Sequence, residues 1–221
     1  MSTLAEIGFS IRNQVKGFFQ SDDERIDIEL IYKMVRQIRS VLIRERYKET
    51  QTVDDQMYQR ICCIEVQCRN IQCNGVDSGV IEYYAEIPSL ESLGGIEIKY
   101  VGTADMLHEF KYRNWSAKLY GDYSPWTGNK PFYTQYDSQM ILGNMPTKGM
   151  KYICMIVLLD DPIGTGCYLL TENDQYPISG NMIHQLELIA IKQLMSSLKE
   201  IPDMKNNASE ISPIDQNIKS T

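Results

Sequence analysis

Apolar residues recur every three or four positions through residues 22–48, and this spacing predicts a long helix. The residues of the stripe are Ile28, Ile31, Val35, Ile38 and Leu42. Ser21 precedes the segment and Glu24 follows three residues later, which is the spacing of a capping box. Acidic residues crowd the first turns and basic residues, Arg36 and Arg39 among them, fill the rest, as the helix dipole favours. At about 1.5 Å per residue, this helix would be on the order of 40 Å long.

Two shorter apolar stripes predict further helices at the two ends of the chain. Residues 3–19 predict a helix that pairs with the first as a helical hairpin, and Thr3 and Glu6 form its capping box. Its stripe consists of Leu4, Ile7, Ile11, Val15 and Phe18 or Phe19. Residues 181–199 predict the last helix, which we expect to pack on the helical region. Its stripe consists of Ile183, Leu186, Ala190, Leu194 and Leu198.

Between the helices the pattern is typical of β-strands. Some segments alternate apolar and polar residues, and others are short apolar runs bounded by Gly, Pro or Asp. The predicted strands are residues 56–73, 79–88, 96–101, 139–142 and 152–159. The last of these is a continuous apolar run, which predicts a central buried strand. Residues 104–110 predict one or two helical turns.

This order of elements predicts an α+β protein with a long N-terminal helix in a helical hairpin, a central antiparallel β-rich domain and a C-terminal helix followed by a flexible tail. The predicted boundaries are 1–50 for the helical region, 51–180 for the β-rich domain, 181–200 for the C-terminal helix and 201–221 for the tail. The tail has no apolar stripe and contains Pro202 and Pro213, which is typical of a flexible segment. Its sparse apolar residues, including Ile211 and Ile214, are spaced as anchors are in segments that fold on a partner.

Charge narrows the classes of function. The chain has 22 lysines and arginines against 29 acidic residues, a net charge of −7. A protein that recognises a DNA or RNA sequence carries a positively charged surface, so the net negative charge argues against that class. The charge is compatible with a surface along which nucleic acid passes without binding. No stretch approaches the roughly 18 to 20 apolar residues that a membrane span needs. The amino terminus also lacks the basic region and apolar run of a secretory signal.

Six cysteines raise the question of a metal or disulfide framework. Four of them cluster and two lie far away; they are Cys62, Cys63, Cys68, Cys73, Cys154 and Cys167. The cluster lacks the paired C-x₂₋₄-C spacing of a zinc site, and the two histidines, His108 and His184, lie apart from it. We therefore expect no metal and no cofactor, with the cysteines as buried free thiols in a reducing environment.

Motifs for catalysis are absent from the sequence. It contains no phosphate-binding glycine loop, no nucleophile elbow and no zinc-protease motif. Asp160 and Asp161, at the end of the apolar strand, are the most catalytic-looking pair, but a polar strand terminus before Pro162 explains them better. The isolated histidines are expected to be structural rather than general bases. The sequence therefore predicts a protein that is not an enzyme.

Tyrosine is the unusual feature of the composition, with fourteen residues in the chain. Tyrosine offers a large apolar area with a polar end, and this suits protein interfaces, although a tyrosine-rich β region would need no such role. The loop of residues 123–133 concentrates aromatic side chains between two prolines, which indicates a tight, well-anchored turn. Tyr123, Trp126 and Tyr133 of this loop are candidate interface residues.

The arrangement resembles a known family. An arginine-rich helix over residues 28–46 precedes a β-rich half that holds Gly94-Gly95-Ile96-Glu97-Ile98, the 123–131 loop and the Asp160-Asp161-Pro162 strand end. This order over roughly residues 25–200 is similar to that of virion structural proteins of crAss-like, short-tailed bacteriophages of gut Bacteroidetes. Among those proteins it resembles the head–tail connector, or ring, proteins stacked beneath the portal.

The resemblance implies a ring of twelve subunits without enzyme activity, which contacts the portal and neighbouring tail proteins in the virion and resides in the host cytoplasm during assembly. An acidic subunit would give the ring a channel through which double-stranded DNA slides. A ring subunit presents two different faces to its neighbours. Candidate interface residues are Arg36, Arg39, Tyr123, Trp126, Tyr133, Ile211 and Ile214. The alternative is a small intracellular enzyme or ligand-binding domain that uses the tyrosine-rich sheet and the Asp160–Asp161 pair.

Overall fold

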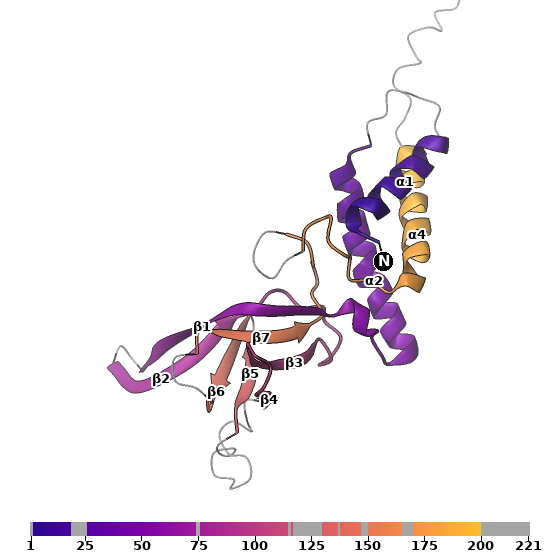
Figure 1. Cartoon of the computed structure of the whole chain (residues 1–221). Helices are drawn as coiled ribbons and strands as arrows, with labels where there is room; N and C mark the ends of the chain where they lie inside the picture. The colour runs from indigo at the N-terminus through magenta and orange to yellow at the C-terminus, as the bar shows by residue number, and fades with distance from the viewer. Residues whose placement is uncertain are drawn as a thin grey trace, which may run out of the picture.

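A group of three helices stands at one end of a twisted β-sheet, and the longest helix leads directly into the first strand (Figure 1). The computed structural model describes residues 2–18, 26–73, 76–114, 116, 130–136, 138–146, 150–164 and 170–199. Its elements are α1 (Leu4–Phe18), α2 (Ile28–Thr50), the 3₁₀ turn η1 (Asp55–Met57), β1 (Gln59–Cys73), β2 (Val76–Glu86), β3 (Ile98–Thr103), β4 (Lys111–Tyr112), β5 (Phe132–Tyr136), β6 (Gln139–Gly143), β7 (Tyr152–Val157) and α4 (Gly180–Lys199).

The helix ends follow local side-chain chemistry. The predicted capping box at the start of α1 is confirmed, since the Thr3 amide donates to Glu6 Oε2 and the Glu6 amide donates to Thr3 Oγ1, both at 3.1 Å. Helix α2 begins later than predicted, because Asp27 caps it by accepting a hydrogen bond from the Glu29 amide at 3.0 Å. The proposed cap at Ser21 and Glu24 lies outside the described residues.

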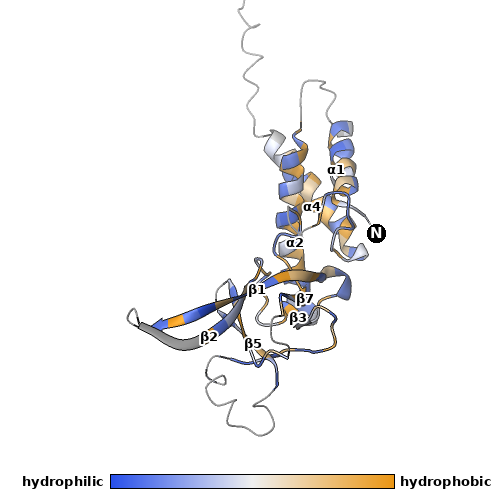
Figure 2. Cartoon of the chain, turned by 60° about the vertical axis from the view of Figure 1, so that its left-hand side comes forward, coloured by the Kyte–Doolittle hydropathy of each residue, from blue (hydrophilic) through white to orange (hydrophobic). Residues whose placement is uncertain are grey.

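The three helices bury their apolar stripes against one another, and hydrophobic and hydrophilic positions alternate along each of them (Figure 2). The predicted stripes are confirmed at the residues of α1, α2 and α4 that have almost no exposed surface. These residues are Leu4, Ile7, Ile11, Val15, Ile31, Val35, Ile38, Leu42, Leu186, Ala190 and Leu194. None of the described helices is long and apolar enough to cross a membrane.

The described strands form one seven-stranded sheet in the order β3-β7-β1-β2-β6-β5-β4. Every neighbouring pair is antiparallel except β4 and β5, which are parallel, so the sheet is mixed rather than purely antiparallel. The α+β class, the N-terminal helical hairpin and the C-terminal helix are confirmed. The domain boundaries stay predictions.

Two local expectations in the β-rich part need correction. Strands β4 and β5 were not among the predicted strands, because each is short and borders the proline-containing loop. Residues 104–110 form no helical turn; the segment is a tight turn in which the amide of Thr103 donates to the carbonyl of His108 at 3.1 Å. Asp105 stabilises this turn by accepting hydrogen bonds from the Thr103 hydroxyl and from the Leu107 amide, which also lowers its pKa.

Two apolar clusters fill the interior. One lies among the helices and includes Met57, Leu93 and Leu158 from outside them, and the other lies against the sheet. Leu158 and Leu159 are consecutive at the end of β7 and fully buried, yet Leu158 belongs to the helical cluster and Leu159 to the sheet cluster. The end of β7 therefore fastens the two clusters to each other.

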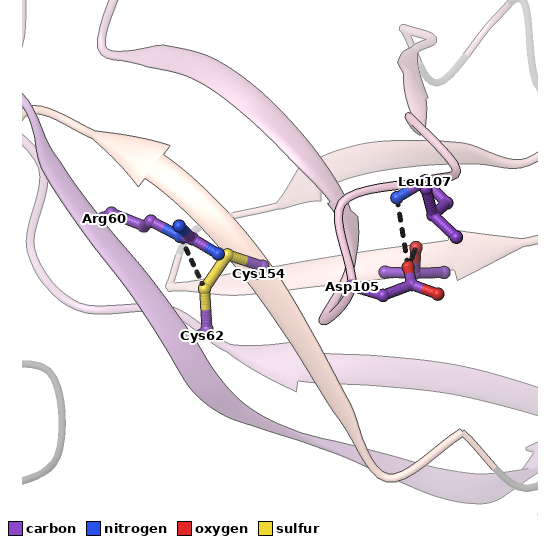
Figure 3. Close-up of a disulfide and its surroundings, with 6 residues drawn as sticks. Arg60, Cys62, Asp105, Leu107 and Cys154 are labelled. Atoms are coloured by element: carbon purple, nitrogen blue, oxygen red, sulfur yellow. Dashed lines mark hydrogen bonds between the residues drawn. A yellow bond between two sulfur atoms is a disulfide. The ribbon is translucent and has the colours of Figure 1, made fainter.

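The cysteine prediction is wrong for three residues. Cys62 on β1 and Cys154 on β7 form a disulfide (Figure 3), and Cys63 is also disulfide-bonded. The β1–β7 register that pairs Ile61 with Met155 places Cys62 opposite Cys154, and the register shifts only between there and Ile64. A separation of 92 residues along the chain hides this pairing from sequence spacing. Cys68 has a free thiol as expected, but it is exposed rather than buried, and Cys167 lies outside the described residues.

Candidate functional site

The polar side of α2 is bonded to three chain segments that lead into and out of the sheet. We call this set of contacts the α2 junction: Arg36, Arg39, Ser40 and Arg44 on the helix, with Glu91, Leu159, Asp160, Asp161, Tyr176 and Pro177 on the segments. The four helical residues follow one another at spacings of three, one and four, so they share the side of α2 next to its buried stripe. The α2 junction therefore contains three arginines from the basic part of the helix that the sequence predicts.

Arg39 is the centre of the junction and has no exposed surface. Its Nε donates to the carbonyl of Pro177 and its Nη1 to the carbonyl of Leu159, each at 2.9 Å. The guanidinium also lies 5.9 Å from the centre of the Tyr176 ring. Burial lowers the pKa of Arg39, and the nearby Tyr176, Glu91, Asp160 and Asp161 oppose that change. These dipoles and charges make a buried cation tolerable at this position.

Charged contacts surround the buried arginine. Arg36 Nη1 lies 2.9 Å from Asp161 Oδ2 in a partly exposed ion pair. Arg44 Nε donates to Glu91 Oε1, and the Glu91 side chain is fully buried. Because a buried carboxylate without a cation would be strongly destabilising, Arg44 stabilises the segment that leads to β3.

Tyr176 closes the junction from the side of α4. Its ring is almost fully buried, and burial raises the pKa of its phenol to about 12 even though Arg39 opposes the rise. Its backbone amide donates to the carbonyl of Ser2 at 3.1 Å, which ties the start of the chain to the same place. The α2 junction therefore holds together the start of the chain before α1, the segment before α4 and the segment that follows β7.

The Asp160–Asp161 pair, which the alternative function would use, faces an open pocket of about 340 Å³. The pocket is lined by Lys33, Arg36, Gln37, Asp160 and Asp161. Asp160 accepts a hydrogen bond from the Ser40 hydroxyl at 3.3 Å, and Asp161 accepts one from the Ile163 amide at 3.1 Å besides its ion pair. Both carboxylates therefore bond to the helix or to their own turn, which supports the interpretation of a polar strand terminus.

Two of the predicted interface residues, Arg36 and Arg39, lie in the α2 junction. Tyr133 is a buried residue of β5 whose ring lies 5.5 Å from that of Tyr112, and burial raises its pKa to about 12. The remaining candidates, Tyr123, Trp126, Ile211 and Ile214, lie outside the described residues. The assignment of all seven candidates to an interface between subunits stays a prediction.

Sequence reasoning missed Glu91, the buried partner of Arg44. Its only sequence signal is a single acid in a Leu-Glu-Ser-Leu segment, and its partner lies 47 residues away. Within the part of the chain that the structure describes, no three His, Cys, Asp or Glu side chains are placed to hold a metal ion.

The chain matches a known protein family. A family described as phage tail ring protein 2 matches residues 7–217 of the 221. No curated protein matches the chain.

Replacement of Arg39 by methionine should lower the free energy of unfolding by about 2–4 kcal/mol, because two buried carbonyls lose their donors. Lys33→Met, on an exposed position of the same helix, is the control and should change it by about 0.5 kcal/mol or less. Urea unfolding of the two variants measures both values. An Arg39→Met variant as stable as the parent would show that the desolvation of the guanidinium cancels its hydrogen bonds.

Ionisation of Tyr176 should lower the free energy of unfolding at alkaline pH. Its folded pKa of about 12 exceeds the ordinary 10.0, so its contribution is complete below pH 10 and is lost as the pH rises toward 12. The difference corresponds to roughly 3 kcal/mol. Tyr176→Phe should therefore lose less unfolding free energy than the parent across this pH range, measured by urea unfolding at each pH. Tyr136→Phe, at a mostly exposed tyrosine, should behave as the parent does; equal pH dependence in all three proteins would contradict the assignment.

Proposed function

The chain belongs to the phage tail ring protein 2 family, whose members form a ring in the tails of crAss-like phages, and from this premise we propose that it builds one ring of the connector between portal and tail. Its role is that of a structural protein of the virion. The observation that carries the proposal is the family match, which extends over nearly the whole chain.

The α2 junction supports a structural role. A ring subunit that carries contacts on both its helices and its sheet needs the two parts held at a fixed angle. Arg39, with its two carbonyl bonds, and the ion pairs of Arg36 and Arg44 fasten helix to sheet at several points. We therefore assign these residues to the internal frame of the subunit, on which the contacts between subunits depend.

The net charge of −7 supports a channel role for the ring. An acidic lumen repels the phosphate backbone, so the genome would pass without binding to the wall. In this proposal the ring has twelve subunits and contacts the portal on one side and a further tail protein on the other.

Electron microscopy of the purified full-length chain, alone and mixed with its portal protein, tests this function. We expect closed rings with twelve-fold symmetry and a ring–portal complex. A chain that stays monomeric alone and with the portal would overturn the connector assignment, and rings of another symmetry would overturn the stoichiometry alone.

Residues 201–221 are proposed to dock on the portal or on a neighbouring ring. Ile201, Met204, Ile211, Ile214 and Ile218 are their sparse apolar anchors. Deletion of these residues should leave the thermal unfolding of the chain nearly unchanged and weaken its complex with the portal or neighbouring ring, because anchors contribute only when the partner is present. Calorimetry measures the first effect and co-sedimentation the second. A deletion variant that unfolds several degrees earlier would assign the segment to the core of the subunit.

A further inference from the structure

A row of residues on one face of the sheet crosses five strands. Strand register places Glu65 of β1 beside Tyr152 of β7, and Glu86 of β2 beside Gln139 of β6, which in turn lies beside Tyr136 of β5. The pairing of Val66 with Ala85 brings Glu65 and Glu86 next to each other. Cross-strand neighbours share a face, so we call these five residues the outer sheet row.

The two acids of this row lie side by side, and Arg69, which reaches the row, donates to Gln139 at 3.2 Å rather than to either acid. Glu65 and Glu86 are exposed, and among the described residues neither forms an ion pair. Like charges directly opposite each other destabilise a sheet. On the same face, by contrast, Glu82 is paired with Arg69 at 2.8 Å. Two large, exposed tyrosines lie at the ends of the row, Tyr152 with 47% and Tyr136 with 63% of its surface accessible. The row is thus an acidic centre between aromatic ends.

Helix α2 presents the opposite chemistry on the side away from its buried stripe. Exposed residues follow one another there at spacings of three or four, so they form one line along the helix. These residues, the α2 stripe, are Leu30, Lys33, Gln37, Val41, Arg44 and Lys48. Three are cations and none is acidic, but Arg44 is already paired with Glu91 in the α2 junction, so Lys33 and Lys48 carry the charge of the stripe. Leu30 and Val41 each leave 50% of their surface exposed.

We propose that the α2 stripe of one copy of this chain packs on the outer sheet row of the next copy in the ring. Lys33, which lies between Leu30 and Val41 on the helix, would neutralise the acidic centre, and Leu30 and Val41 would cover the tyrosine rings. This inference rests on the proposed ring, and it names the two faces of the contact.

The dimensions agree with this packing. Leu30 and Val41, which would cover the tyrosines at the two ends of the row, are 11 positions apart on the helix, which is about 16 Å. The row crosses four strand spacings, which is about 19 Å. A helix that covers an exposed sheet face is an ordinary layer arrangement in proteins. The two patches also differ from each other, as a ring with head-to-tail contacts requires.

Reciprocal charge reversal in the full-length chain tests the contact. A Glu65→Lys/Glu86→Lys variant and a Lys33→Glu variant should each need at least about tenfold more protein for half-maximal ring assembly, because attraction becomes repulsion. Mixed in equal amounts, the two variants should assemble again as alternating rings, since every contact then joins opposite charges. Native mass spectrometry distinguishes an alternating ring from rings of one variant.

A matched control reverses two other exposed helical lysines, Lys16→Glu/Lys192→Glu, and should assemble as the parent does. Recovery in the mixture also shows that the separate variants are folded. Rings that form normally in both reversed variants would overturn this contact and leave the ring function intact. If the reversed variants form rings but no longer bind the portal, the two patches contact another protein, and the proposed contact between copies of this chain is wrong. A parent chain that never assembles would overturn the ring and the contact together.

Discussion

The structure of the subunit depends on the buried cation of Arg39. Arg39 lies where α2, the end of β7 and the start of α4 come together, and it bonds to the backbone carbonyls of Leu159 and Pro177 rather than to side chains. Carbonyl dipoles compensate the charge only when both segments hold their position. The helical part and the sheet are therefore constrained together, because a change in the angle between them would leave a charge buried without partners.

The layout of the two apolar clusters enforces the same constraint. Leu158 and Leu159 belong to different clusters although they are neighbours in the chain, so the sheet cannot slide along the helices without opening one of them. Arg36 with Asp161 and Arg44 with Glu91 add directional contacts at the two sides of this point. A subunit built this way presents its outer surfaces at fixed positions.

Sequence periodicity predicted the helices well, because the stripes of α1, α2 and α4 and the Thr3–Glu6 box depend only on neighbours within a turn. It failed where the deciding partner is far along the chain. Arg39 appears in the sequence as one more surface arginine, since its acceptors lie 120 and 138 residues away and are backbone atoms without a sequence signature. The Cys62–Cys154 pairing and the parallel pairing of β4 with β5 depend on long-range register in the same way.

The bond between β1 and β7 determines how the chain would carry tension. Cys62 lies just after the turn that follows α2, and Cys154 lies in the strand whose end leads toward α4. A force applied between α2 and α4 passes from β1 to β7 through the Cys62–Cys154 disulfide. The intervening residues, which include β2 to β6, form a closed covalent loop outside that path. Force applied to the helices would therefore reach the two bonded strands, while most of the sheet lies outside the covalent path that carries it.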